Sequence, residues 1–171
     1  MFRTFVARAG QVRRTLGITL ATVVLGAVVL GATAKGTIAY KGKSGAVNVA
    51  VRHAYLVKGP DLVTKKPKRR IVVAVADVGA ALRSCATMLC SDGGIREGMT
   101  LDLDVGPRLT HWFVANDERI QYSGTAPLES LTLTTDTAER VAGRWVLDHS
   151  TGGGPTLDTT FDAPLVKTIE K

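Results

Sequence analysis

Apolar and polar residues alternate along residues 46–58, and this period of two predicts the β-strand around which the rest of the chain is arranged. The side chains on one parity are those of Val47, Val49, Val51, His53, Tyr55 and Val57. We expect Val49, Val51 and Tyr55 to be buried against Trp145 and Phe161 or their neighbours, while Arg52, on the other parity, reaches solvent. Because thirteen residues are many for one strand, the run is expected to bend or to pass from one sheet to another.

Further short segments have the alternation or the β-branched composition of strands, namely 37–40, 70–77, 99–105, 109–115, 119–125, 128–135, 140–149 and 157–162. Residues 70–77 are nearly all apolar, which is typical of a strand buried on both faces. Turn signals separate these segments, among them Gly42, Gly106 and the run 152–154. Eight or nine strands at this spacing predict a mainly β chain, folded as an antiparallel β-sandwich or a flattened barrel.

One segment departs from the β pattern. Residues 78–90 favour helix, Asp77 is placed to cap its start, and Ser91 with the glycines that follow is placed to end it. We therefore expect one short helical insertion near residues 78–90, as a single helix or as two separate turns of helix.

The first 34 residues have the layout of a secretory signal peptide. Four arginines precede an uncharged stretch, 15–34, whose apolar core is followed by the small residues Ala32 and Ala34. Cleavage after Ala34 would leave residues 35–171 as a single exported β-domain in the periplasm or outside the cell. The alternative is an uncleaved anchor, because about 20 uncharged residues can span a bilayer; only then would the membrane be a partner.

The formal net charge of +7 is unevenly distributed. Four of the 22 basic residues and none of the 15 acidic ones lie before residue 35, so the rest carries +3. Five of the remaining basic residues fall in one short run, Lys65, Lys66, Lys68, Arg69 and Arg70. We interpret this run as a solvated loop, with contact to an anionic surface as the alternative. Specific nucleic-acid binding is not expected, because the rest of the exported part is slightly acidic.

Few residues indicate chemistry. Cys85 and Cys90 are the only cysteines, and in an oxidising compartment such a pair predicts a disulfide. The histidines His53, His111 and His149 could bind a metal only if the fold brought them together. The carboxylate pairs Asp102 with Asp104 and Asp158 with Asp162 are each expected on an exposed sheet face. We read the glycine-rich run 150–155 as a hairpin connection and assign no catalytic, cofactor-binding or metal-binding residue.

The sequence also resembles a known group of proteins. Residues 36–38, 53–57, 71–77, 143–145 and 161–165 are similar to segments of a group of uncharacterised exported bacterial proteins. These carry an immunoglobulin-like or other β-sandwich domain behind a signal peptide. The resemblance covers about residues 36–165 and implies compartment and fold class; it supplies no activity or site.

Together these observations predict an exported β-sandwich that serves as a binding or structural module of the cell envelope, with an envelope protein or an anionic polymer as its partner. One alternative is a small secreted hydrolase that uses carboxylates or a histidine-bound metal. The other is a membrane-tethered module that docks on anionic surfaces through residues 65–70.

Overall fold

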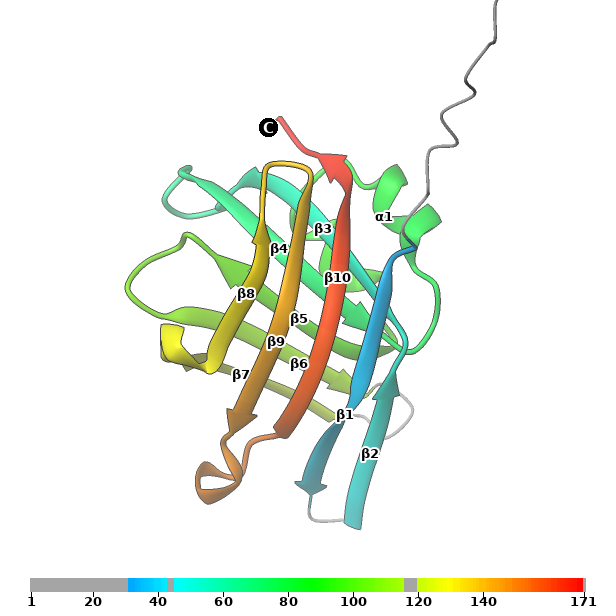
Figure 1. Ribbon diagram of the computed structural model, residues 1–171, viewed down its shortest axis with the longest axis vertical. Coiled ribbons are helices and arrows are strands. Elements are labelled where there is room, and N and C mark those ends of the chain that lie inside the picture. Colours follow the sequence, from blue (N-terminus) through cyan, green and yellow to red (C-terminus); the bar gives the residue numbers. More distant parts are fainter. Residues whose placement is uncertain (1–30, 43–44, 116–119, 171) are drawn as a thin grey trace, which may run out of the picture.

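Two β-sheets that share one strand form the body of the computed structural model, which describes residues 31–42, 45–115 and 120–170 (Figure 1). The strands of this described part are β1 (Thr33–Gly42), β2 (Gly45–Val51), β3 (His53–Pro60), β4 (Pro67–Ala74), β5 (Glu97–Leu103), β6 (Leu109–Ala115), β7 (Ile120–Ala126), β8 (Leu131–Asp136), β9 (Arg140–Asp148) and β10 (Thr156–Thr168). Two short helices, α1 (Gly79–Ser84) and α2 (Cys90–Gly93), lie between β4 and β5. The predicted mainly β fold is thus confirmed.

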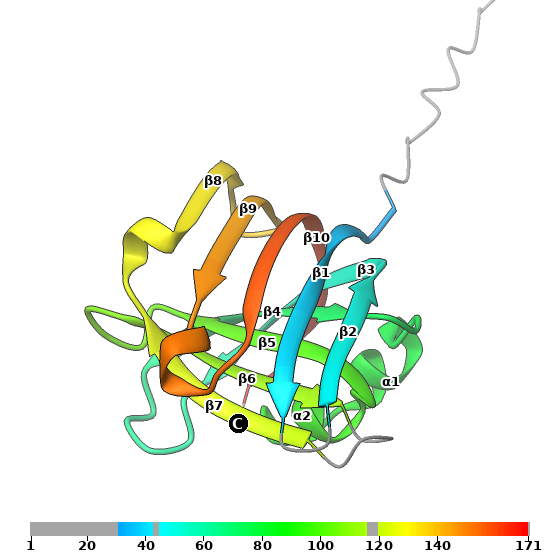
Figure 2. The same cartoon turned by 90° about the horizontal axis from the view of Figure 1, so that it is seen from below.

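The first sheet has the order β2-β1-β10-β9-β8, and the second has the order β10-β3-β4-β5-β6-β7. The N-terminal part of β10 pairs antiparallel with β1 and β9, whereas its end, from Leu165 to Thr168, pairs parallel with β3. All other strand pairs are antiparallel. The first sheet curls over the second, and the strands of the two sheets cross (Figures 1 and 2).

The run 46–58 changes sheet at Arg52. Its first half, β2, is an edge strand of the first sheet, and its second half, β3, lies inside the second sheet. The Arg52 N–H donates to the Ala74 carbonyl (3.0 Å), and the Arg52 carbonyl accepts from the Ala34 N–H (2.9 Å), so the corner backbone has partners. The Arg52 side chain is exposed, as predicted.

Two apolar cores lie on the two faces of the second sheet. Val49 and Val51 are buried between the sheets in the same cluster as Trp145 and Phe161, which confirms that part of the prediction. Tyr55 is buried as predicted but in the other core, against the helices. The prediction of its neighbours was wrong because the corner at Arg52 reverses the parity of the strand.

The second core packs α1 and α2 against the outer face of the second sheet. Leu82 and Met88 of the helical segment belong to one cluster with Val57, Val72 and other side chains of β3, β4 and β6. The residues of β4 from Ile71 to Ala74 are therefore buried on both faces, as predicted. The prediction that this strand continues to residue 77 was wrong, because β4 ends at Ala74.

The helical insertion consists of two turns of helix joined by a disulfide. Cys85 and Cys90 are bonded with their Cα atoms 5.4 Å apart, which confirms the predicted pair. Asp77 accepts a hydrogen bond from the Gly79 N–H (2.9 Å) and another from the Tyr55 hydroxyl. Burial, reinforced by this carboxylate, raises the pKa of Tyr55 to about 12. The helical insertion near residues 78–90 is confirmed, and α2 ends at Gly93, within the run from Ser91 onward that was predicted to end it.

Other differences concern strand number and the chain ends. The described residues form ten strands, not eight or nine, because the run at residue 52 is divided. Strand β10 also continues to Thr168, whereas the predicted strand ends at residue 162. β1 begins two residues before the predicted cleavage point. Residues 1–30, which hold most of the predicted signal peptide, and residues 43–44, 116–119 and 171 lie outside the described residues. None of the described helices is long and apolar enough to span a membrane.

We predict that Val51→Asp unfolds the domain, whereas Arg52→Ser leaves it folded. The carboxylate introduced in place of Val51 would lie unpaired in the core, at a cost of several kcal/mol. The Arg52 side chain is exposed, so its loss should cost less than about 1 kcal/mol. Thermal melting of both variants measures the difference, and a larger loss for Arg52→Ser would contradict the placement of the corner.

Candidate functional site

A groove of about 560 Å³ lies between the β3–β4 loop and the C-terminal end of β10. Its lining is rich in lysine, arginine and proline and consists of Lys58, Gly59, Pro60, Lys65, Pro67, Lys68, Arg69, Asp104, Thr168, Ile169 and Glu170. The wall from β3 is fixed to the chain end because the Ile169 N–H donates to the Lys58 carbonyl (2.8 Å). The groove thus joins the basic run to a segment about a hundred residues later in the chain.

Asp61 holds the loop that carries Lys65. Its carboxylate accepts hydrogen bonds from the backbone of Val63 (3.1 Å) and of Thr64 (2.8 Å), and from the Thr64 hydroxyl (3.0 Å). The hydrogen bond from the Thr64 backbone is the main reason why the pKa of Asp61 falls to about 2. Lys65 adopts a left-handed conformation with φ of 60°, which is unfavourable for a residue with a Cβ. Strained positions of this kind occur often at functional sites.

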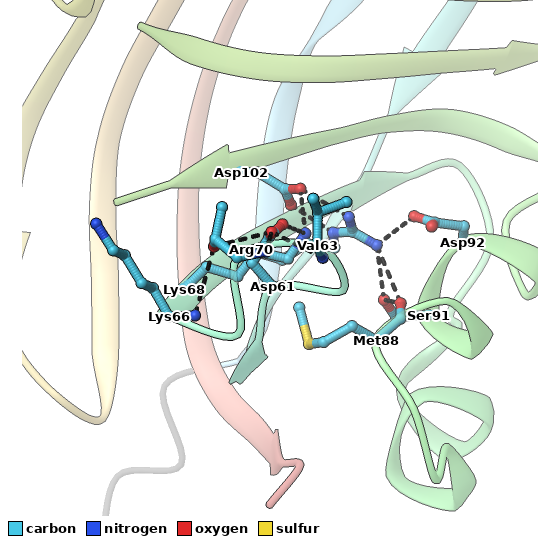
Figure 3. Close-up of polar contacts among 10 residues, drawn as sticks. Asp61, Val63, Lys66, Lys68, Arg70, Met88, Ser91, Asp92 and Asp102 are labelled. Carbon is cyan, nitrogen blue, oxygen red and sulfur yellow. Dashed lines mark hydrogen bonds and ion pairs between the residues drawn. The ribbon is translucent and has the colours of Figure 1, made fainter. Parts of the chain in front are cut away.

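Beside the groove, Asp102 of β5 pairs with two buried cations of β4 (Figure 3). Its carboxylate accepts hydrogen bonds from Lys68 Nζ (2.7 Å) and from Arg70 Nη2 (2.8 Å). Lys68 also lies 3.4 Å from Asp61. The register that places Arg70 opposite Asp102 makes these contacts, and Asp102 is 7 % exposed. Buried charges are tolerated only when they are paired in this way.

The other end of Arg70 reaches α2 (Figure 3). Its Nη1 atom donates to the Met88 carbonyl and to the Ser91 hydroxyl, each at 3.1 Å, and forms an ion pair with Asp92. Burial opposes the charged guanidinium, but Asp102 and Asp92 outweigh it and raise the pKa of Arg70. Burial likewise raises the pKa of Asp92. Arg70 therefore ties the helical segment to the second sheet.

Arg69 has partners of its own. It donates to Asp104 through Nε (2.7 Å) and Nη2 (3.1 Å) and forms an ion pair with Asp136. Hydrogen bonding to Asp104 is the main reason why the pKa of Arg69 is raised. Through its contacts with Asp104 and Asp136, Arg69 joins the end of β5 in the second sheet to β8 in the first sheet.

The five basic residues singled out in the sequence thus divide into two groups. Lys65 and Lys66 are exposed in the loop, as expected. Lys68 and Arg70 are buried, and Arg69 is half-buried, so the prediction of a solvated loop was wrong for these three. The prediction also missed Lys58, which the fold brings to the same groove. Contact with an anionic surface remains a prediction for this run.

The predicted carboxylate pairs are all engaged with cations. Asp102 was expected to be exposed, but the helical insertion and the β3–β4 loop cover its face of the sheet. Asp158 accepts from Arg144 Nε (2.8 Å), and Asp162 accepts from Arg140 Nε (2.6 Å). The Arg144 guanidinium lowers the pKa of Asp158.

Two of the three histidines meet. The ring centroids of His111 and His149 are 5.0 Å apart, whereas His53 stacks on Tyr55. Burial, with a smaller effect of His149, lowers the pKa of His111 to about 4. The described residues contain no group of three or more His, Cys, Asp or Glu side chains suited to a metal ion. The glycine-rich run is a hairpin connection, as predicted, with Gly153 left-handed at φ of 72°.

Comparisons of the chain with models of protein families, with curated proteins and with solved structures find no match. The residues and their geometry are therefore the basis for function.

We predict that Asp102→Asn destabilises the protein far more than Asp158→Asn. The first change removes the charge that Lys68 and Arg70 share in the interior, which costs about 3–5 kcal/mol. The second removes an exposed pair, which typically contributes about 1 kcal/mol or less. Urea unfolding of both variants measures the two free energies, and equal values would contradict the structural role of Asp102.

Proposed function

We propose that this chain is an exported binding module of the cell envelope and that it holds an anionic ligand in the groove beside β3 and β10. The observation that carries the proposal is the pairing pattern of the cations in the groove. Lys68 and Arg69 have carboxylate partners, but Lys58 and Lys65 have none among the described residues. Two lysines without acid partners at one groove favour a ligand that brings its own negative charge.

The groove also has apolar surface between these lysines. Pro60, Pro67 and Ile169 contribute to its lining, and Gly59 packs closely against Met88 of the second core. A ligand with a phosphate or carboxylate on a less polar body fits both features. The acid Glu170 lies in the same lining, so it opposes the two lysines and should weaken the binding of an anion.

The hydrolase alternative has less support. The carboxylates of Asp102, Asp158 and Asp162 are bonded to lysine or arginine. A general acid for glycoside hydrolysis needs a raised pKa, whereas the pKa of Asp158 is lowered. Most of the interior between the sheets is filled by apolar side chains. A binding module is therefore the better proposal.

Export is tested first. We expect the mature chain to begin at Lys35, because the residues before it have the signal-peptide layout. Intact-mass analysis of protein recovered from the cell envelope measures this directly. A mass that includes residues 1–34 would favour the uncleaved anchor instead.

Binding is tested with inorganic polyphosphate as a soluble anionic polymer. Lys58→Gln with Lys65→Gln should weaken binding about tenfold at low salt, because two charged contacts of about 0.5–1 kcal/mol each are lost. The matched control is Lys35→Gln with Lys41→Gln, which makes the same charge change on exposed residues of β1 and should have little effect. Glu170→Gln should strengthen binding. Calorimetry at two salt concentrations measures all four proteins, since screening separates charge effects from packing.

Equal losses in the lysine pair and in its control would overturn the groove as the site. Vesicles of phosphatidylglycerol and of phosphatidylcholine distinguish the second alternative. Binding to phosphatidylglycerol vesicles alone, without polyphosphate binding, would show docking on an anionic membrane instead of a groove for a polymer.

A further inference from the structure

The space between the two sheets holds polar atoms without partners in the described part of the chain. They are both ring nitrogens of His111, Nδ1 of His149, Nε1 of Trp145 and the hydroxyl of Thr159. Buried polar groups almost always have hydrogen-bond partners, so a cluster of exceptions in one region needs a physical explanation. Three of these five atoms belong to the two histidines that the fold brings together.

The distance between the His111 and His149 rings matches that of two imidazoles bound to one metal ion. His111 comes from β6, and His149 follows directly after β9, so each sheet contributes one ring. Their centroids are 5.0 Å apart and their planes are inclined by 52°. With metal–nitrogen bonds of about 2.0–2.1 Å and a near-tetrahedral angle, two imidazole centroids lie about 5 Å apart.

The surroundings hold both rings in place. The ring of Tyr122 lies 6.1 Å from that of His111 and 6.2 Å from that of His149, and Trp145 packs edge-on against His111 at 5.9 Å. His111 is 1 % exposed, and the ring of His149 packs against it. Side chains that are already fixed lose little further freedom on binding an ion.

The glycine-rich hairpin connection lies against His149 and Tyr122. The N–H groups of Gly152 (3.0 Å) and Gly154 (2.9 Å) both donate to the His149 carbonyl. A Cβ at Gly154 would lie 2.5 Å from Tyr122 Cζ and 2.8 Å from His149 Cβ, so the backbone passes close to the Tyr122 ring and to the base of the His149 side chain. A cavity of about 180 Å³ is lined by the same connection, including Ser150, Gly153 and Gly154. Neither histidine is among the residues that line this cavity.

We propose that His111 and His149 together bind a divalent transition-metal ion of the Zn²⁺ and Cu²⁺ class, with solvent completing its coordination. Two imidazoles suit these ions, whereas Ca²⁺ and Mg²⁺ require oxygen ligands. No Asp, Glu or Cys joins the pair as a third ligand among the described residues. Binding should therefore be weaker than at a complete structural zinc site. This site is separate from the groove, so the two proposals can fail independently.

Copper quenching of tryptophan fluorescence tests the proposal on the full chain without a histidine tag. The chain has two tryptophans, and Trp112→Phe leaves Trp145, which is next to His111, as the only emitter. We expect Cu²⁺ to quench this emission in a saturable manner. His149→Gln should weaken the effect at least tenfold, because one of two ligands is lost. The matched control, His53→Gln, removes the histidine outside the pair and should leave quenching unchanged.

Thermal melting with Zn²⁺ and with EDTA gives a second readout that requires no substitution. An ion that binds only the folded chain raises the melting temperature, and EDTA should reverse the rise. The absence of both quenching and stabilisation at millimolar metal would overturn the proposal, whether or not His149→Gln folds. Equal loss of quenching in His53→Gln and His149→Gln would overturn it as well.

Discussion

The pairing of β10 with strands of both sheets is the constraint on which the rest of the structure depends. One part of this strand lies between β1 and β9, and its end runs beside β3. Because the chain also crosses from β2 to β3 at Arg52, two connections close the same side of the sandwich. The sheets are thereby held at an angle to each other, and the apolar core forms where their inner faces meet. The groove forms at the end of β10, where the shared strand meets the basic loop.

A second consequence is that both faces of the second sheet are buried. The helical insertion covers the outer face, so positions that alternation assigns to solvent become interior. Asp102, Lys68 and Arg70 lie at these positions, and each is stable there only because the others neutralise it. The basic run is thus largely a structural device, and only its exposed part remains free to contact a ligand.

Much of the fold could be predicted from the sequence, because alternation and turn residues are local signals. They located β6 and the helical insertion. The only two cysteines indicated the disulfide, and the length of the run 46–58 indicated a bend or a change of sheet. The site could not be predicted in the same way. Whether Asp102 or Lys68 faces water depends on what packs over the sheet, and that is decided by distant segments. The groove and the histidine pair also join residues far apart in the chain, for which no spacing rule exists.

The disulfide has a consequence for the order in which the domain assembles. Met88, whose carbonyl accepts from Arg70, lies inside the short covalent ring that the Cys85–Cys90 bond closes. Ser91 and Asp92, two further acceptors for Arg70, follow that ring directly. Before the cysteines are oxidised, this segment has more conformations to lose when it meets the guanidinium. Formation of the disulfide thus restricts the segment that carries three acceptors of Arg70. The burial of this guanidinium therefore becomes more favourable once the two cysteines are oxidised.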